Sequence, residues 1–201
     1  MNPQVQAGGK GRRQLVMLTV LFLLPPIAAW LAWQYLGERG VAATTNNGTL
    51  ISPARPLALQ GALESAEGSL NPDEFAGRWL YVVYGQKDCD AACQRQLYVT
   101  RQTRVAVNKD MPRVKRLLVL DGVPDAALAQ MLAKDHQDLL IAVGLKNEER
   151  VKFQGENFDT QGGQFFLVDP LGNLMMFYSA DAEPRGVLRD LQKLLKVSQV
   201  G

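Results

Sequence analysis

The chain has 201 residues, a formal charge of +2 at pH 7 and 7% aromatic residues. This length allows one medium-sized domain with its own core plus an appendage. The small net charge and the scattered basic residues exclude the basic footprint of a nucleic-acid-binding protein.

The first predicted element is a membrane-spanning helix over residues 15–36. This run carries no charged residue, and at a rise of about 1.5 Å per residue it is long enough to cross a bilayer core of about 30 Å. Lys10, Arg12 and Arg13 precede the run. The positive-inside rule therefore places residues 1–14 in the cytoplasm and exports the rest of the chain.

A cleaved signal peptide is the alternative interpretation of this run. Its apolar part would span about 7–15 residues and end in a small-x-small cleavage site. The run here is longer, and its Ala28-Ala29 pair is followed by Trp30. The sequence therefore favours an uncleaved single-pass anchor in the inner (cytoplasmic) membrane, with the C-terminal domain in the periplasm.

A linker and one further domain follow the predicted anchor. Residues 37–56 are rich in Gly, Ala, Thr, Asn and Pro and show no apolar periodicity, which is typical of a linker. No later apolar run is long enough to span a membrane. We therefore expect residues 57–201 to form one domain outside the bilayer.

The first half of this domain alternates between strand and helix patterns. Residues 79–84 and 114–120 are short apolar runs that indicate buried strands. Residues 91–108 carry few helix breakers, and residues 125–134 begin with an aspartate suited to a helix N-cap. The pattern predicts strand, helix, strand, helix.

The second half predicts a short strand, a hairpin and a final helix. The short strand covers residues 141–143, and the hairpin joins 164–168 to 174–178 through a type I turn. Residues 184–196 carry an apolar stripe suited to packing on a sheet. The complete order is typical of a thioredoxin-like α/β sandwich.

Both cysteines of the chain lie in one stretch, residues 85–94 (GQKDCDAACQ). The stretch leaves the strand predicted at 79–84, so we expect Cys89 and Cys93 on one exposed face of the first helical turn, with Cα atoms about 6 Å apart. A helix N-terminus favours the thiolate, which is both a nucleophile and a soft-metal ligand. The exposed position and the helix N-terminus therefore favour a reactive pair of thiols over two inert ones.

Three other interpretations of the cysteine pair stay open at this point. The pair can be a structural disulfide, which an oxidising compartment permits, although so short a loop gains little by chain entropy. The cysteines can also be two unrelated buried thiols. A zinc site is disfavoured because zinc normally needs four ligands and the sequence has no second Cys/His pair.

Three segments of the chain carry a family resemblance. They are NGTLISPARPL from Asn47, FAGRWLYVVYGQKDCDAAC from Phe75 and FFLVDPLGNL from Phe165. In this order, behind an N-terminal anchor, they resemble the Sco/SenC family of membrane-anchored, thioredoxin-fold proteins that assist assembly of cytochrome c oxidase. The CxxxC motif after a strand that ends in aromatic-Gly is the strongest element.

The resemblance implies copper chemistry. Sco proteins bind copper through two cysteines and a histidine, and they pass copper or reducing equivalents to the dinuclear copper site of the oxidase. The implied partners are the copper-site subunit of the oxidase or other assembly factors. Cys89 and Cys93 match the two cysteines, and thiolates suit Cu(I). The histidine position falls at about Gln161, which is not expected to ligate.

The absence of that histidine changes the mechanism that the resemblance favours. His136, the sole histidine, is expected to be a solvated surface residue. Met175 and Met176 are expected to be core residues rather than weak copper ligands. Two thiolates remain able to hold Cu(I), whereas binding of Cu(II) would suffer most.

The sequence is therefore compatible with three functions. The favoured one is a thiol–disulfide reductant at the oxidase copper site, in which Cys89, expected to be the more exposed cysteine, attacks a partner disulfide and Cys93 resolves the mixed disulfide. The second is a Cu(I) chaperone with a two-thiolate site. The third is a non-catalytic membrane-tethered assembly scaffold, in which the cysteines only form a disulfide.

Overall fold

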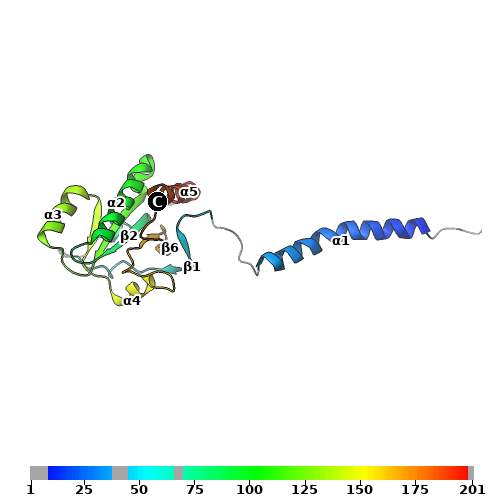
Figure 1. Cartoon of the computed structure of the whole chain (residues 1–201), viewed down its shortest axis with the longest axis horizontal. Coiled ribbons are helices and arrows are strands. Elements are labelled where there is room, and N and C mark those ends of the chain that lie inside the picture. The colour runs from blue at the N-terminus through cyan, green and yellow to red at the C-terminus, as the bar shows by residue number, and fades with distance from the viewer. Residues whose placement is uncertain (1–8, 38–44, 66–69, 199–201) are drawn as a thin grey trace, which may run out of the picture. The chain divides into compact units, whose positions relative to one another are not determined.

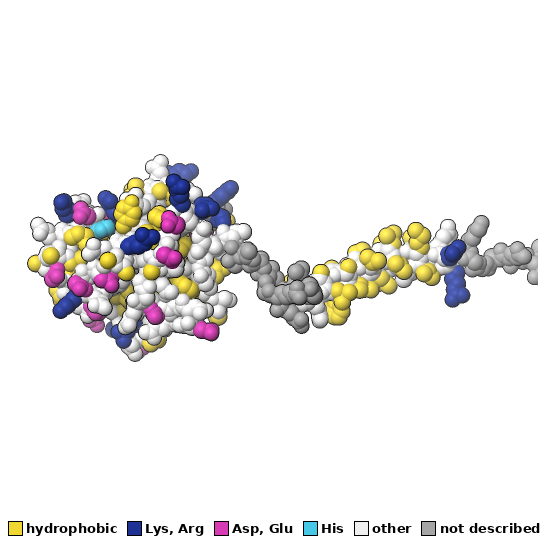
Figure 2. Space-filling view, viewed as in Figure 1, with side chains coloured by type: hydrophobic (Ala, Val, Ile, Leu, Met, Phe, Trp, Pro, Cys, Tyr) yellow, Lys and Arg dark blue, Asp and Glu magenta, His cyan; other side chains and the backbone are white. Residues whose placement is uncertain are grey.

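The computed structural model describes residues 9–37, 45–65 and 70–198 and divides into two units (Figure 1). Helix α1 (Gly9–Gly37) belongs to the first unit. Within this helix, Gly11–Gln34 is long and apolar enough to cross a membrane, and Figure 2 shows hydrophobic side chains along its length. The helix contains Pro25 and Pro26. The apolar N-terminal helix expected from the sequence is therefore present.

Two parts of the predicted organisation fall outside the described residues, and one part is wrong. Residues 1–8 of the N-terminal segment and residues 38–44 of the linker lie outside the description. The end of the predicted linker is instead strand β1 (Thr49–Pro56), which pairs antiparallel with β6 (Asn173–Tyr178). Its prolines obscured the strand pattern, and an edge strand tolerates proline because one of its sides forms no ladder.

The second unit, Asn46–Gly201, is built on a six-stranded sheet of order β1-β6-β5-β2-β3-β4. The central strand β2 (Trp79–Gly85) runs parallel to β3 (Val114–Leu120) and antiparallel to β5 (Phe165–Val168). Strand β4 (Leu139–Ala142) pairs with β3 in parallel at the far edge. The mixed sheet places the carboxyl ends of β2 and β3 side by side.

Side chains alternate between two core clusters, one on each face of the sheet. Helices α2 (Ala91–Ala106), α3 (Ala126–Asp135) and α5 (Pro184–Val197) contribute apolar residues to one cluster. The other cluster includes Phe75, which follows η1 (Pro72–Glu74), and Phe153, the last residue of η3 (Val151–Phe153). Figure 1 shows α2, α3 and α5 against the sheet. This arrangement confirms the predicted thioredoxin-like α/β class.

The predicted hairpin and its turn are also confirmed. Strands β5 and β6 pair antiparallel. The Gly172 N–H donates to the Asp169 carbonyl at 2.9 Å, and Gly172 has a φ of +84°. The sequence pattern did not reveal two short helical segments, η2 (Asn108–Arg113) and α4 (Asn147–Arg150). Such short helices are too brief to show a helical period.

Candidate functional site

Cys89 and Cys93 lie at the junction of β2 and α2 and form a disulfide, with Cα atoms 5.2 Å apart. Cys89 precedes the helix, has a φ of +45°, and donates its N–H to the Gln86 carbonyl at 2.9 Å. The Asp90 side chain caps α2 by accepting the Cys93 N–H at 2.9 Å. The sequence predicted Cys89 within the first helical turn. Cys89 is instead a loop residue that precedes the helix.

Both cysteines are buried, so the predicted exposed face is wrong. Cys89 is 0% exposed and Cys93 is 3% exposed, and Cys89 is therefore not the more exposed of the two. Both belong to the core cluster that includes Leu97 and Leu120. The left-handed conformation of Cys89 turns the loop so that its side chain enters this cluster instead of continuing the helix face.

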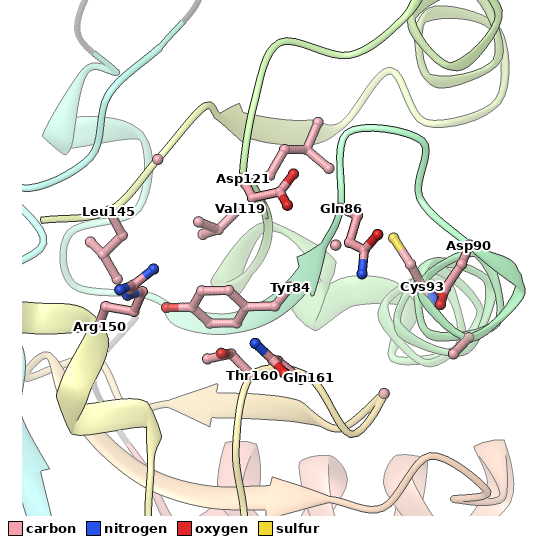
Figure 3. A pocket seen from close by; sticks show the side chains of 15 residues that line it. Tyr84, Gln86, Asp90, Cys93, Val119, Asp121, Leu145, Arg150, Thr160 and Gln161 are labelled. Atoms are coloured by element: carbon pink, nitrogen blue, oxygen red, sulfur yellow. The ribbon is translucent and has the colours of Figure 1, made fainter. Parts of the chain in front are cut away.

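Cys93 nevertheless lines a cleft of about 320 Å³, whereas Cys89 is not among the residues that line it (Figure 3). The cleft is formed by the ends of β2 and β3, the first turn of α2, and residues from the segments around 144–150 and 160–163. In α/β sheets, ligands bind beyond the carboxyl ends of parallel strands. One residue of the disulfide, Cys93, therefore lines a cleft at the carboxyl ends of β2 and β3, where ligands bind in α/β sheets.

Gln161, the residue at the expected histidine position, lines the same cleft as Cys93. Its backbone N–H donates to Asp159 Oδ1 at 2.8 Å. The fold thus brings Cys93 and Gln161, two of the three residues that the family resemblance paired, to one cleft. Within residues 9–37, 45–65 and 70–198, no group of three or more His, Cys, Asp or Glu side chains is arranged to hold a metal ion. A reduced Cys89–Cys93 pair would supply two sulfur donors.

The two methionines considered as weak copper ligands lie in or against the core. Met176 is 1% exposed and belongs to the cluster of α2 and α5 residues, and Met175 packs against that cluster. Neither is among the residues that line the cleft. The expectation that they are core residues is confirmed.

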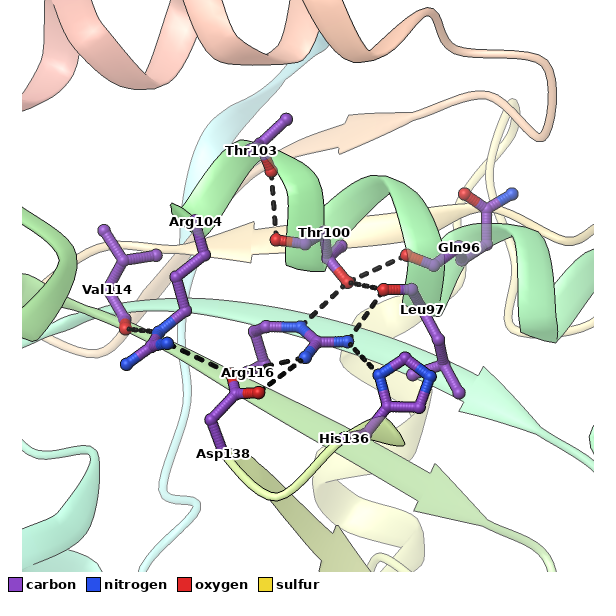
Figure 4. Close-up of polar contacts among 9 residues, drawn as sticks. All are labelled: Gln96, Leu97, Thr100, Thr103, Arg104, Val114, Arg116, His136 and Asp138. Carbon is purple, nitrogen blue, oxygen red and sulfur yellow. Dashed lines mark hydrogen bonds and ion pairs between the residues drawn. The ribbon is translucent and has the colours of Figure 1, made fainter. Parts of the chain in front are cut away.

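His136 lies in a polar network around Arg116, so its expected role as a solvated surface residue is wrong (Figure 4). The fully buried Arg116 side chain donates to the Leu97 carbonyl at 2.7 Å and to Thr100 Oγ1 at 3.2 Å. It also forms an ion pair with Asp138 at 3.2 Å. His136 Nδ1 lies 3.3 Å from Arg116 Nη2.

Burial and charge together set the ionisation of this network. Burial lowers the pKa of Arg116 to about 10, although Asp138 opposes that shift. Burial, followed by the guanidinium of Arg116, lowers the pKa of His136 below its ordinary value. Burial acts to raise the pKa of Asp138, but Arg116 and Arg104 outweigh it and hold that pKa below its usual range. The native network therefore favours a neutral imidazole beside a charged pair.

Tyr84 and Arg150 are cleft residues that reasoning from the sequence missed. The Tyr84 ring meets Phe153 and Phe166 edge-on, with centroids 5.2 and 6.1 Å apart. Its hydroxyl is buried and has no hydrogen-bond partner among the described residues, and burial raises its pKa. The only sequence signal was an aromatic residue at the end of a strand, and nothing pointed to Arg150.

A family model described as transmembrane-like, thioredoxin-like, C-terminal domain matches residues 79–198. The chain belongs to this family. The match covers the whole stretch from the central strand of this thioredoxin-like domain to its last helix, including both cysteines and Gln161. No sequence among the curated proteins matches the chain.

Solved Sco structures share the fold. Apo Sco1 from Thermus thermophilus is 22% identical, with 77% of this chain and 99% of that chain covered and a TM-score of 0.56. Yeast Sco1 with copper bound is 17% identical, with 68% and 90% covered and a TM-score of 0.53. BsSco, described with a disulfide switch and as a member of the Sco family of cytochrome c oxidase assembly proteins, is 10% identical, with 75% and 100% covered and a TM-score of 0.53. The expected resemblance to the Sco/SenC family is confirmed at the level of the fold.

Proposed function

We propose that this protein is a Sco-like accessory factor for cytochrome c oxidase assembly that reduces a disulfide at the oxidase copper site. The observation that carries the proposal is the position of the disulfide, with Cys93 lining a cleft and Cys89 buried behind it. The Sco fold, and a relative described with a disulfide switch, support the same chemistry.

In this proposal the roles of the two cysteines are reversed from those expected from the sequence. In the reduced protein, the Cys93 thiolate attacks one sulfur of the partner disulfide, and the partner's other sulfur leaves as a thiolate. The Cys89 thiol then loses its proton and attacks Cys93 Sγ, which releases the partner's second thiolate and forms the Cys89–Cys93 disulfide. Two electrons pass to the partner, and an external dithiol must restore the reduced protein.

The first turn of α2 assists this exchange. The unpaired N–H groups of a helix N-terminus stabilise negative charge, and Cys93 is the third residue of α2. The Asp90 carboxylate, which caps the same turn, opposes this effect because it adds negative charge nearby. The helix N-terminus and Asp90 therefore act in opposite directions on a thiolate at Cys93.

The proposal also includes a membrane location. Residues 1–14 would lie in the cytoplasm, residues 15–36 would anchor the chain in the inner membrane, and the thioredoxin-like domain would work in the periplasm. Helix α1 supports an anchor by its length and apolar composition. The partner would be the copper-site subunit of the oxidase or another assembly factor.

Single-cysteine variants test the proposed roles. After incubation with the oxidised copper-site subunit, Cys89→Ser should accumulate a mixed disulfide through Cys93, and Cys93→Ser should accumulate much less. Wild-type protein should release the subunit with reduced thiols. If Cys89→Ser leaves the subunit thiols as reduced as wild type does, the reductant function is wrong. A trap that forms only through Cys89 would reverse the two roles.

Carriage of Cu(I) is the second candidate, because the two cysteines are close enough to bond to each other and yeast Sco1 of the same fold has been solved with copper bound. The ion would be cargo, held by the two reduced sulfurs. Titration of the reduced protein with Cu(I) against a competing chelator tests it, and an affinity equal to that of a Cys89→Ser/Cys93→Ser variant would exclude it. If that double variant fully restores oxidase assembly in cells, only the scaffold function remains.

A further inference from the structure

Two of the polar groups that line the cleft beside Cys93, and that the reductant mechanism does not use, lie close together. They are the Tyr84 hydroxyl and the Arg150 guanidinium, and Figure 3 shows the hydroxyl pointing toward Arg150. A buried hydroxyl without a hydrogen bond costs about 1–3 kcal/mol. Because the Tyr84 hydroxyl has no partner among the described residues, a bound ligand would remove this cost.

The orientation of Tyr84 is fixed by its neighbours. Phe153 and Phe166 contact its ring edge-on, and Phe153 and Phe166 also contact each other at 5.1 Å between centroids. The ring is therefore held in one orientation at the wall of the cleft by a packed aromatic cluster. A group held in this way binds a ligand without losing side-chain freedom.

Arg150 supplies a positive charge at the same place. It ends the short helix α4, and its Nη2 donates to Asn147 Oδ1 at 3.2 Å. A guanidinium carries several further N–H donors arranged as a planar fork that matches a carboxylate. The hydroxyl and the guanidinium together can donate to both oxygens of one carboxylate, and such charge-assisted bonds are about twice as strong as neutral ones.

Charge in the cleft is separated along its length. Figure 3 shows Asp90 beside Cys93, Asp121 between Val119 and Gln86 near the middle of the view, and Arg150 at the end opposite Cys93. A ligand carboxylate is therefore repelled near the sulfur and attracted at the Arg150 end. A volume of about 320 Å³ is at the small end for ligand pockets, so at most a few residues of a partner segment fit within the cleft.

From this arrangement we propose that Tyr84 and Arg150 form a carboxylate subsite, which selects partner segments that carry an Asp or Glu separated from the reacting cysteine rather than adjacent to it. The inference rests on the proposed reductant function, because it identifies the class of partner sequence that the same cleft accepts. The subsite orients the partner so that its sulfur meets Cys93 at the other end.

Disulfide capture by the full-length Cys89→Ser variant in neutral detergent tests the subsite. Short peptides with one cysteine, each supplied as a mixed disulfide with glutathione, carry a Glu one, two or three residues before or after the cysteine, and matched peptides carry Gln. Cys93 exchanges with the peptide disulfide, so one S–S bond forms, one breaks, and glutathione leaves as a thiolate. Mass spectrometry of separate equilibrations measures how strongly each peptide is captured.

We expect the Glu peptide to be captured about 5–10-fold more strongly than its Gln match when the Glu is two or three residues away. The preference should shrink in high salt. Adding Arg150→Gln or Tyr84→Phe should each reduce the preference, whereas adding Lys146→Gln should not, because Lys146 is a nearby exposed cation that does not line the cleft.

Equal capture of Glu and Gln peptides at every position, a preference confined to the adjacent position, or no reaction at Cys93 would each overturn the inference. The proposed reductant function fails separately. If the wild-type dithiol does not reduce the small neutral compound 2-hydroxyethyl disulfide, that function is wrong. Capture by the variant still measures the subsite in that case, because it needs only the Cys93 thiol.

Discussion

Gly85 ends strand β2 directly against Cys93. A Cβ atom built at Gly85 would lie 2.6 Å from Cys93 Sγ and 3.3 Å from Leu120 Cδ2. The first distance is far shorter than a normal contact, so the missing side chain provides the space that the sulfur occupies. The position of Cys93 at the cleft therefore depends on a residue outside the CxxxC motif.

We predict that Gly85→Ala destabilises the fold by about 1–3 kcal/mol, because an added methyl group overpacks the core beside Cys93. Denaturant unfolding followed by circular dichroism measures the stability, and a thiol-reactive maleimide measures the altered reactivity of the reduced Cys93. Gly122→Ala is the matched control, since its Cβ would meet only Lys87 Cβ at 3.8 Å. Equal stability of the two variants would contradict the role of Gly85.

Single residues of the site were predictable to different degrees. The spacing of Cys89 and Cys93 indicated that they can pair, and the family resemblance brought Gln161 to the same site. The burial of Cys89 was not predictable, because it follows from one left-handed residue that the sequence does not mark. Arg150 reaches the cleft from a segment 57 positions beyond Cys93, and only the tertiary fold brings them together.

The Arg116 network connects three elements. Arg116 belongs to β3, its donors contact the Leu97 carbonyl and Thr100 on α2, and its ion-pair partner Asp138 immediately precedes β4. Asp138 also forms an ion pair with Arg104 of α2 at 3.3 Å. The network therefore holds the helix that carries Cys93 against the parallel part of the sheet.

The network predicts a pH dependence of stability. The pKa of His136 is lower in the folded protein than in the unfolded chain, because burial, Arg116 and Arg101 disfavour its charged form more than Asp138 and Asp135 favour it. The unfolded chain therefore binds more protons at this residue below about pH 6.5. The contribution of His136 to stability is complete above that pH and is lost as the pH falls toward the lower pKa of the folded state.

Urea unfolding between about pH 7 and pH 5 checks this prediction. The free energy of unfolding of the wild type should fall more steeply than that of His136→Gln, by no more than about 1.4 kcal/mol per pH unit for a single proton. The lowered pKa of Asp138 acts only at more acidic pH and does not interfere. Identical slopes for the two proteins would show that His136 does not contribute.

Whole elements were more predictable than single positions. The strands and helices with clear apolar periods, such as β3 and α5, were placed within a few residues. Strand β1 was missed because its stability comes from pairing with β6, a partner more than 100 residues away, rather than from its own composition. Helix α4 was missed because a four-residue helix carries no period.

The molecule as a whole combines a long apolar helix with a thioredoxin-like unit. We predict that the full-length protein stays with the membrane fraction after alkaline carbonate extraction and keeps its N-terminal residues. Leu21→Arg, near the middle of Gly11–Gln34, should weaken insertion by about 2.5–3.5 kcal/mol, whereas Leu21→Val should not. A mature protein that has lost these residues would identify the helix as a cleaved signal peptide instead.

The burial of Cys89 affects how well a partner fits the reduced and the oxidised forms of the protein. On reduction the two sulfur atoms must move apart, so either Cys93 shifts toward the cleft or the side chains packed around Cys89 shift to make room. If Cys93 moves, the wall of the cleft differs between the reduced and the oxidised protein. A partner that fits the reduced form would then fit the oxidised form less well, and this difference would favour its release after the exchange.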